Sequence, residues 1–314
     1  MNIRKLSAQE HGKTRDLYET VFSEDEKAFV DYYYTWKTKD NTIYVAEDET
    51  GIHGMVHLNP FDVWIKGQVR RLHYIVAVAT QEEYRHKGIM RRLLAAAEQE
   101  MAKNGEMFTF LMPASEKIYS PFGYRFFCEQ RQGIIGSIPS DPAENTKKII
   151  CRPLQRKEYA ALAHFVNETL AREYDVFIYR DEAYYERLCA EQQCQNGNVL
   201  VLVQKIPEEA EQIIGTFCTA QEGCTDAGTG NPEKRESSIR ELIAAPGWER
   251  EVLWGLQQFG AAGLKVEGCN CPELLLRETG NIPDWKPLLM AKVPKGTIWT
   301  NRWEMQKVFI NEGV

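Results

Sequence analysis

The chain has 314 residues, with 38 lysines and arginines against 45 aspartates and glutamates, so its formal net charge at pH 7 is −7. An acidic surface repels nucleic acid and anionic lipid, which argues against both as partners. No apolar run approaches the roughly 20 residues of a membrane span, and the first residues, MNIRKLSAQEHGK, lack the apolar core of a signal peptide. We therefore expect a cytoplasmic protein of two domains.

The first part of the chain predicts a strand, two helices and a series of strands. In chain order we expect a strand over residues 1–6, helices over 7–21 and 24–37, strands over 42–47 and 53–59, and a strand pair over 63–69 and 71–80. Alternation of polar and apolar residues indicates the strands, and helical spacing of apolar residues indicates the helices.

A buried strand, a helix and another buried strand follow one another in the middle of this part. The stretch LHYIVAVA (residues 72–79) is almost entirely apolar, as expected of a central strand. A helix over residues 88–103 carries one apolar stripe, and MFTFL (107–111) is again apolar. This order predicts a βαβ unit with a right-handed crossover. One or two more strands should reach residue 136.

A polar stretch with two prolines, IPSDPAENTKK (138–148), predicts a linker, after which the pattern restarts. The second part should contain a strand (IICRPL), helices over 155–173 and 181–195, a hairpin (NVLVLVQK and QIIGTFCTA), a strand (SIRELIAA), a helix over 247–260 and strands LKVEGCN and PLLMAKV. Both parts share one order of elements, which indicates an internal duplication. We predict domains over residues 1–137 and 149–293, with a tail over 294–314.

The stretch EEYRHKGIMRR (82–92) gathers five basic side chains around Gly88 at a helix start, where positive charge opposes the helix dipole. A buried strand, a short loop and a helix N-terminus together favour an anion site, and Gly88 lets a ligand approach the backbone. The alternative is a solvated, charged helix start. The second part has only APG (245–247) at this place, so we expect it to lack the site.

Other signatures of catalysis or of metal binding do not occur. The chain has no Walker A loop, no G-x-G-x-x-G, no G-x-S-x-G, no H-E-x-x-H and no EF-hand loop. Its eight cysteines form no C-x-x-C pair, and CNC (269–271) has no second half. We expect reduced thiols and no metal.

Two segments resemble the GNAT superfamily of N-acetyltransferases. VATQEEYRHKGIMRRLL resembles motif A, whose core is Q/R-x-x-G-x-G/A, with Met90 in place of the final small residue. ASEKIYSPFGYRF (114–126) resembles a later segment, Y-x-x-x-G-F/Y. With its second, degenerate copy, the chain resembles the Eis (enhanced intracellular survival) subgroup over residues 1–293. The resemblance implies tandem GNAT folds, each a mixed, mostly antiparallel sheet flanked by helices.

The resemblance also implies acetyl-CoA as co-substrate. Its pyrophosphate would lie on the backbone amides of the cationic loop and its pantetheine arm would pair with the preceding strand. The implied cofactor-binding residues are Val78, Ala79, Thr80, Arg85, His86, Lys87, Gly88, Ile89, Met90, Arg91, Ala114 and Ser115.

By the same resemblance, Tyr119 is the general acid that protonates the leaving thiolate. The general base is open. In the proteins that this chain resembles, a third domain similar to sterol carrier protein supplies a C-terminal carboxylate, and here about 20 residues follow Val293, so that group would be Val314. Alternatives are a water chain or one of the acids Glu24, Asp25 and Glu26.

The acceptor pocket is expected between the N-terminal helices and the strand ends, lined by Phe22, Glu24, Phe29, Tyr33 and Trp36. Aromatic walls near acids suit a cationic amine. We expect an N-acetyltransferase for an aminoglycoside, polyamine or lysine-like amine on a small molecule or peptide, as a possible homo-oligomer. Two alternatives are a non-enzymatic acyl-CoA sensor or scaffold and a transferase for a larger acyl group.

Overall fold

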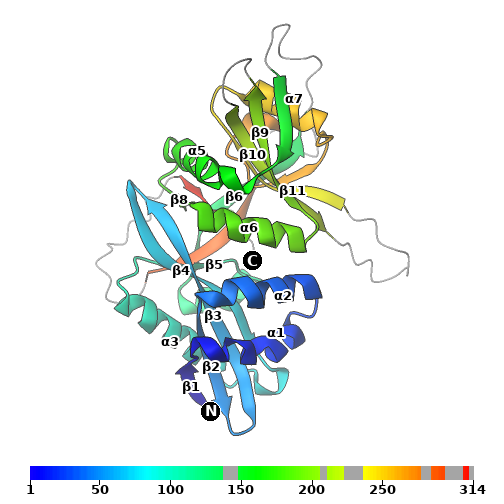
Figure 1. Cartoon of the computed structure of the whole chain (residues 1–314). Coiled ribbons are helices and arrows are strands. Elements are labelled where there is room, and N and C mark those ends of the chain that lie inside the picture. The colour runs from blue at the N-terminus through cyan, green and yellow to red at the C-terminus, as the bar shows by residue number, and fades with distance from the viewer. Residues whose placement is uncertain (137–147, 206–210, 223–235, 277–283, 294–306, 311–314) are drawn as a thin grey trace.

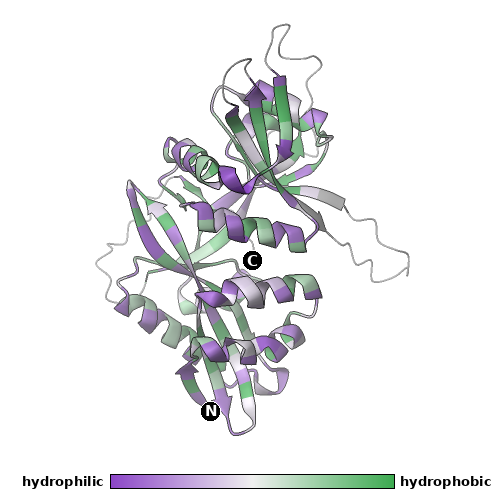
Figure 2. Ribbon diagram, in the orientation of Figure 1, coloured by the Kyte–Doolittle hydropathy of each residue, from purple (hydrophilic) through white to green (hydrophobic). Residues whose placement is uncertain are grey.

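The computed structural model describes residues 1–136, 148–205, 211–222, 236–276, 284–293 and 307–310. Two layered α/β halves lie one above the other, and helix α2 (Lys27–Trp36) of the first packs against helix α6 (Glu182–Cys194) of the second (Figure 1). Hydrophobic residues gather in strands, whereas the helices carry both hydrophobic and hydrophilic positions (Figure 2). The prediction of a mixed α/β fold with a mostly antiparallel sheet flanked by helices is confirmed.

The first half follows the predicted order of elements. It contains β1 (Asn2–Lys5), η1 (Ala8–Thr14), α1 (Arg15–Val21), α2, η2 (Lys37–Lys39), β2 (Thr42–Asp48), β3 (Gly51–Ile65), β4 (Gln68–Thr80), η3 (Glu82–Tyr84), α3 (Ile89–Lys103), β5 (Thr109–Leu111), α4 (Glu116–Tyr119), η4 (Ser120–Phe122) and β6 (Arg125–Ile135). The predicted helix over residues 7–21 is a 3-10 turn followed by a short α-helix.

One strand prediction is wrong. The segments 53–59 and 63–69 are not separate strands, because β3 runs without interruption from Gly51 to Ile65 and turns into β4 at Lys66-Gly67. Pro60 lies in the middle of β3, one position past Asn59 and beyond the last residue, Leu58, that pairs with β2. A proline is tolerated there because β2 no longer pairs with β3 at this position, so the N–H group that proline lacks is not needed for a hydrogen bond to β2.

Helix α3 covers one face of β2, β3 and β4, as its apolar stripe predicts. Leu93, Leu94 and Ala97 are buried against strand side chains such as Leu58 and Ile75. Gly54 permits this close packing, since a Cβ on it would lie 2.8 Å from Ile89 Cγ2. The start of α3 is therefore held tightly over the end of β4.

The second half repeats the order of the first and adds short strands. It contains β7 (Lys148–Pro153), η5 (Arg156–Glu158), α5 (Tyr159–Ala171), β8 (Val176–Ile178), α6, β9 (Asn198–Lys205), β10 (Gln212–Glu222), β11 (Glu236–Ala244), α7 (Glu249–Gln258), β12 (Lys265–Glu267), η6 (Pro272–Leu274), β13 (Leu275–Leu276), β14 (Asp284–Lys292) and β15 (Val308–Phe309). The sequence analysis missed β8, β13 and β15, which are too short to show a periodic pattern.

The two halves share strands. Strand β14, near the end of the predicted second domain, lies between β5 and β6 of the first half. Strand β6 in turn pairs with β12 and β13 of the second half, and β8 pairs with β3. The domain limits drawn from the sequence remain a prediction, but the sheet itself continues across them.

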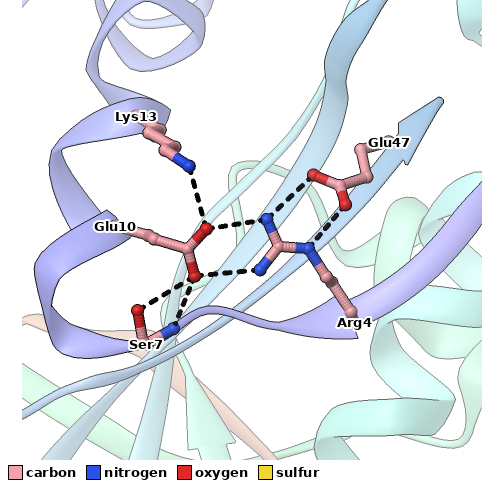
Figure 3. Close-up of polar contacts among 5 residues, drawn as sticks. All are labelled: Arg4, Ser7, Glu10, Lys13 and Glu47. Carbon is pink, nitrogen blue, oxygen red and sulfur yellow. Dashed lines mark hydrogen bonds and ion pairs between the residues drawn. The ribbon is translucent and has the colours of Figure 1, made fainter. Parts of the chain in front are cut away.

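The N-terminal strand is held by a network of charged groups around Arg4 (Figure 3). Both terminal nitrogens of the Arg4 guanidinium donate to Glu10, each at 3.0 Å, and its Nε donates to Glu47 on β2. Glu10 also accepts from the backbone and hydroxyl of Ser7 in a capping box and from Lys13. These hydrogen bonds, with that from Arg4 the strongest, hold the pKa of Glu10 far below its ordinary value. The network fixes η1, from which α1 runs directly on, over the sheet.

A buried polar group joins the two halves. Lys37 Nζ lies 3.0 Å from Glu191 on α6, with only 5% and 8% of the two side chains exposed. Tyr32 donates to the same carboxylate at 2.8 Å. Nearby, Arg187 of α6 contacts Asp40 at 2.8 Å. Because charges this deep in a protein are stable only when paired, this group fixes how α2 lies against α6.

No helix among the described residues is both long and apolar enough to span a bilayer. The seven cysteines in the described ranges are free thiols.

Replacing Glu191 by alanine should strongly destabilise the fold. The change leaves the Lys37 ammonium buried without its carboxylate, which costs about 3–5 kcal/mol, and leaves the Tyr32 hydroxyl only its longer hydrogen bond to the carbonyl of Arg187. Urea denaturation followed by circular dichroism measures this loss. Glu186→Ala, which removes an exposed partner of Arg156, is the control and should hardly move the midpoint; an equal, small shift for both variants would contradict the prediction.

Candidate active site

A cavity of about 820 Å³ opens between the end of β4, the loop before α3 and helix α4. It is lined by Val21, Phe22, Tyr74, Ile75, Val76, Ala77, Val78, Ala79, Thr80, Tyr84, Arg85, His86, Gly88, Ile89, Met90, Arg91, Met112, Ala114, Ile118, Tyr119 and Phe122. A volume of this size falls within the usual range of ligand pockets. Most residues that the sequence assigned to cofactor binding therefore share one cavity; Lys87 and Ser115 do not line it.

The cavity exists because β4 and β5 separate. The two parallel strands are in register only at Tyr74 and Phe110. Beyond Tyr74, β4 continues to Thr80, and a bulge at Ala77, whose φ is +49°, sets two residues of β4 against one of β3. A bulge bends its strand and increases the local twist. The edge of β4 from Ile75 to Thr80 thus faces the cavity instead of a neighbouring strand.

An open strand edge presents backbone N–H and C=O groups to whatever lies beside it. An extended ligand that carries amide groups can pair with such an edge as an added strand would. The predicted contacts of Val78 and Thr80 with a pantetheine arm need this geometry.

At the end of β4 the chain turns into α3 through a loop with two left-handed residues. His86 has a φ of +62°, and Gly88, the N-cap of α3, has a φ of +74°. The first amides of a helix have no carbonyl one turn earlier to accept their hydrogen bonds. The amides of Ile89, Met90 and Arg91 are in this position, beside the cavity. Together with the helix dipole they form a site suited to a phosphate group.

The cationic side chains around this site are exposed and contact aromatic rings or backbone. Lys87 Nζ lies 4.8 Å from the ring centre of Tyr84, and the Arg91 guanidinium carbon lies 5.1 Å from that of Phe122. Arg85 Nε donates to the carbonyl of Thr80 at 3.3 Å. In the described part of the chain, no carboxylate forms an ion pair with any of these three cations. Their charge is therefore available to an anionic ligand.

Tyr119 forms the opposite wall, at the end of α4. Its side chain is only 8% exposed and packs edge-on against Tyr124, with ring centres 6.0 Å apart. Burial raises the pKa of Tyr119 to about 12. The phenol therefore keeps its proton at neutral pH, as a general acid must.

Of the five residues predicted for the acceptor pocket, one lines the cavity. Phe22 lines the cavity, Glu24 is exposed, and Trp36 is half-buried beneath Lys39. Phe29 and Tyr33 are core residues, and the hydroxyl of Tyr33 hydrogen-bonds to Nδ1 of buried His57 at 2.9 Å. For these two the structure corrects the expectation, because Tyr33 packs against the sheet and Phe29 packs against Tyr32, whose hydroxyl donates to Glu191 of α6.

The predicted base Val314 lies outside the described residues. The last described residue before it in the sequence, Ile310, is buried in the hydrophobic cluster that contains Tyr74 and Phe110. Among the three acids proposed as alternatives, Asp25 is half-buried, whereas Glu24 and Glu26 are exposed. Burial raises the pKa of Asp25, and its carboxylate accepts a hydrogen bond from Tyr18 at 2.8 Å.

The sequence analysis missed nine lining residues, namely Val21, Tyr74, Ile75, Val76, Ala77, Tyr84, Met112, Ile118 and Phe122. Of these, Met112 and Ile118 are exposed large apolar side chains, a sign of a binding surface that only the folded structure displays. Within the described ranges, no group of three or more His, Cys, Asp or Glu side chains could hold a metal ion.

The second half builds a similar βαβ unit with a different helix start. Strands β11 and β12 are parallel and connected by α7, like β4, α3 and β5. At the start of α7, however, the amide of Gly247 donates to the carboxylate of Glu249 at 2.8 Å, and Glu251 adds a second negative charge to the first turn. The first turn of α7 is therefore acidic, whereas the loop before α3 is cationic.

Residues 2–127 match the family model of the acetyltransferase (GNAT) domain. This part of the chain is similar to GNAT acetyltransferase domains. The match supports the prediction of an N-acetyltransferase enzyme, and no curated protein matches the sequence.

Three solved structures share the fold at low identity. A protein of unknown function from Enterococcus faecalis V583, described as a probable N-acyltransferase, is 16% identical with a TM-score of 0.69, over 94% of this chain and 73% of its own. A GCN5-related N-acetyltransferase from Anabaena variabilis is 16% identical with a TM-score of 0.70 over the same shares. Eis1 from Mycobacterium abscessus is 15% identical with a TM-score of 0.64, over 93% and 74%. These likenesses concern the whole two-part fold.

Replacing Gly88 by aspartate should abolish CoA binding. The new Cβ meets open space, so the effect comes from a negative charge at the phosphate site and from a positive φ that non-glycine residues disfavour. Isothermal titration calorimetry with CoA measures it. Gly67→Asp, at a hairpin turn with a φ of +91° and equally open surroundings, is the matched control and should bind normally. Undiminished affinity in the Gly88 variant would refute the site.

Proposed function

We propose that this protein transfers an acetyl group from acetyl-CoA directly to a primary amine. The observation that carries the proposal is one cavity that combines an open strand edge, a cationic helix N-terminus and a protonated buried phenol. The GNAT family match over the same residues supports it.

Each part of the cavity suits one part of the co-substrate. The amides at the start of α3, with Arg85 and Arg91, would hold the pyrophosphate. Backbone groups of Val78 and Thr80 would pair with the pantetheine arm, and Ala114 would flank it from the opposite side. The bound thioester supplies the acetyl group; the protein places it and controls the protons.

Tyr119 would deliver a proton to the sulfur as the thiolate leaves. Burial holds the pKa of Tyr119 above that of an ordinary thiol, about 8.5, so the phenol keeps its proton until negative charge develops on the leaving sulfur. The amine must lose a proton before or during attack. Among the acids between α1 and α2 we propose Asp25 for this role, because it is half-buried and its backbone amide donates to the carbonyl of Phe22, which lines the cavity. Val314 remains the other proposed base.

The negative charge of the protein indicates the class of amine that it accepts. The chain is acidic overall, and acids on the α1–α2 segment, Glu24, Asp25 and Glu26, adjoin the cavity residue Phe22. A cationic amine is drawn to such a surface. We therefore propose an aminoglycoside, a polyamine or a lysine-like side chain as acceptor.

The activity is tested by incubating the protein with acetyl-CoA and a panel of these three amine classes while free thiol is measured. We expect thiol release that depends on the amine, and a product heavier by one acetyl group in mass spectrometry. CoA binding without amine-dependent thiol release across the whole panel would instead favour an acyl-CoA sensor.

Tyr119→Phe should lower kcat by about 10²–10⁴-fold, the usual contribution of a general acid, with acetyl-CoA affinity almost unchanged. Because the pKa of Tyr119 is about 12, wild-type kcat should show no decline on the alkaline side below about pH 10. Tyr124→Phe, which removes a fully buried phenol that does not line the cavity, serves as control. A loss of acetyl-CoA binding with intact turnover in the Tyr119 variant would disprove the role.

A further inference from the structure

The cavity closes where β4 and β5 come together, and Tyr74 lies at this closed end. Tyr74 is the β4 residue in register with Phe110 of β5. It lines the cavity with a side chain that is only 2% exposed. From the helix N-terminus at Gly88, the open edge of β4 leads back through Thr80 toward this tyrosine.

The ring of Tyr74 is firmly held. Its hydroxyl accepts a hydrogen bond from the backbone amide of Met112 at 3.2 Å. Met112 directly follows β5, so this hydrogen bond connects β4 to the end of β5. Its ring packs against Phe110 with centres 5.3 Å apart and edge-on against Phe61 at 6.2 Å. A side chain held by backbone, strand and ring contacts makes a rigid wall.

A second pocket lies behind this wall, between the two halves. It has a volume of about 140 Å³, and Phe61 is one of its lining residues. Its charged walls are paired, as in Lys37 with Glu191 and Arg71 with Asp62. The contact of Phe61 with Tyr74 therefore brings this interdomain pocket close to the closed end of the main cavity.

We propose that Tyr74 is a specificity-determining residue that restricts the transferred acyl group to acetyl or a group of similar length. The inference rests on the proposed function, since it assumes that the phosphates bind at α3 and that the arm follows β4. With that orientation, carbons beyond the thioester point toward the closed end and meet the phenol ring. Removing the ring extends the cavity toward Phe61 and the interdomain pocket.

The experiment compares acetyl-, butyryl- and hexanoyl-CoA as donors with the wild type and with Tyr74→Leu. In the wild type, kcat/KM should fall by about tenfold or more from acetyl to butyryl, as a pocket rejects added methylenes. In Tyr74→Leu the ratio of kcat/KM for acetyl-CoA to that for butyryl-CoA should fall below about threefold, and kcat/KM for hexanoyl-CoA should rise the most relative to the wild type. Tyr185→Leu, which truncates an equally buried tyrosine in the core of the second half, should keep the wild-type ratio.

A binding measurement separates this inference from the proposed function. Calorimetry with the non-hydrolysable thioether of hexanoyl-CoA should show weaker binding than CoA in the wild type and recovery in Tyr74→Leu. If no donor is turned over but this binding pattern appears, the transferase activity fails and the length limit stands. Equal kcat/KM for acetyl and hexanoyl donors in the wild type, or an unchanged ratio in Tyr74→Leu, overturns the inference. Tyr74→Phe keeps the ring and should keep the preference, which provides a conservative variant if the leucine variant does not fold.

Discussion

The separation of β4 from β5 beyond Tyr74 is the constraint on which the site depends. On one side of this point the strands are locked together by Glu106, a carboxylate only 3% exposed that accepts from the backbone amide of His73 at 2.8 Å and contacts its ring nitrogen at 2.6 Å. On the other side the bulge at Ala77 redirects β4. The strands are therefore held together at His73 and separate within a few residues, at the bulge, and the cavity lies between them.

The second half of the chain supports the far wall of this opening. Strand β5 has only three residues, too few to stand alone, and its outer edge pairs with β14, which arrives from the second half. Lys292 at the end of β14 contacts Glu98 of α3 at 2.6 Å and lies over the ring of Tyr124. The added strand therefore braces β5 and ties it to the helix whose N-terminus faces the ligand site.

Sequence reasoning succeeds where the signal is local. The loop around Gly88 was predicted because a buried strand, a glycine and a helix start are adjacent in the chain. The position of β14 in the sheet could not be predicted, since it depends on pairing with β5, a strand more than 150 residues earlier. Tyr33 and Tyr74 show the limit for the site: buried aromatic residues in a helix and a strand look alike in sequence, yet the first is core and the second lines the cavity.

The contrast between the two βαβ units lies in the charge at the start of the crossover helix. The loop before α3 carries Arg85 and Lys87, and the first turn of α3 carries Arg91. The first turn of α7 carries Glu249 and Glu251 instead. Acids are stabilised by the dipole at a helix start, but they repel a phosphate. The second half keeps the topology for structural reasons, because its strands complete the sheet of the first, while the positive charge that suits an anion lies at the start of α3.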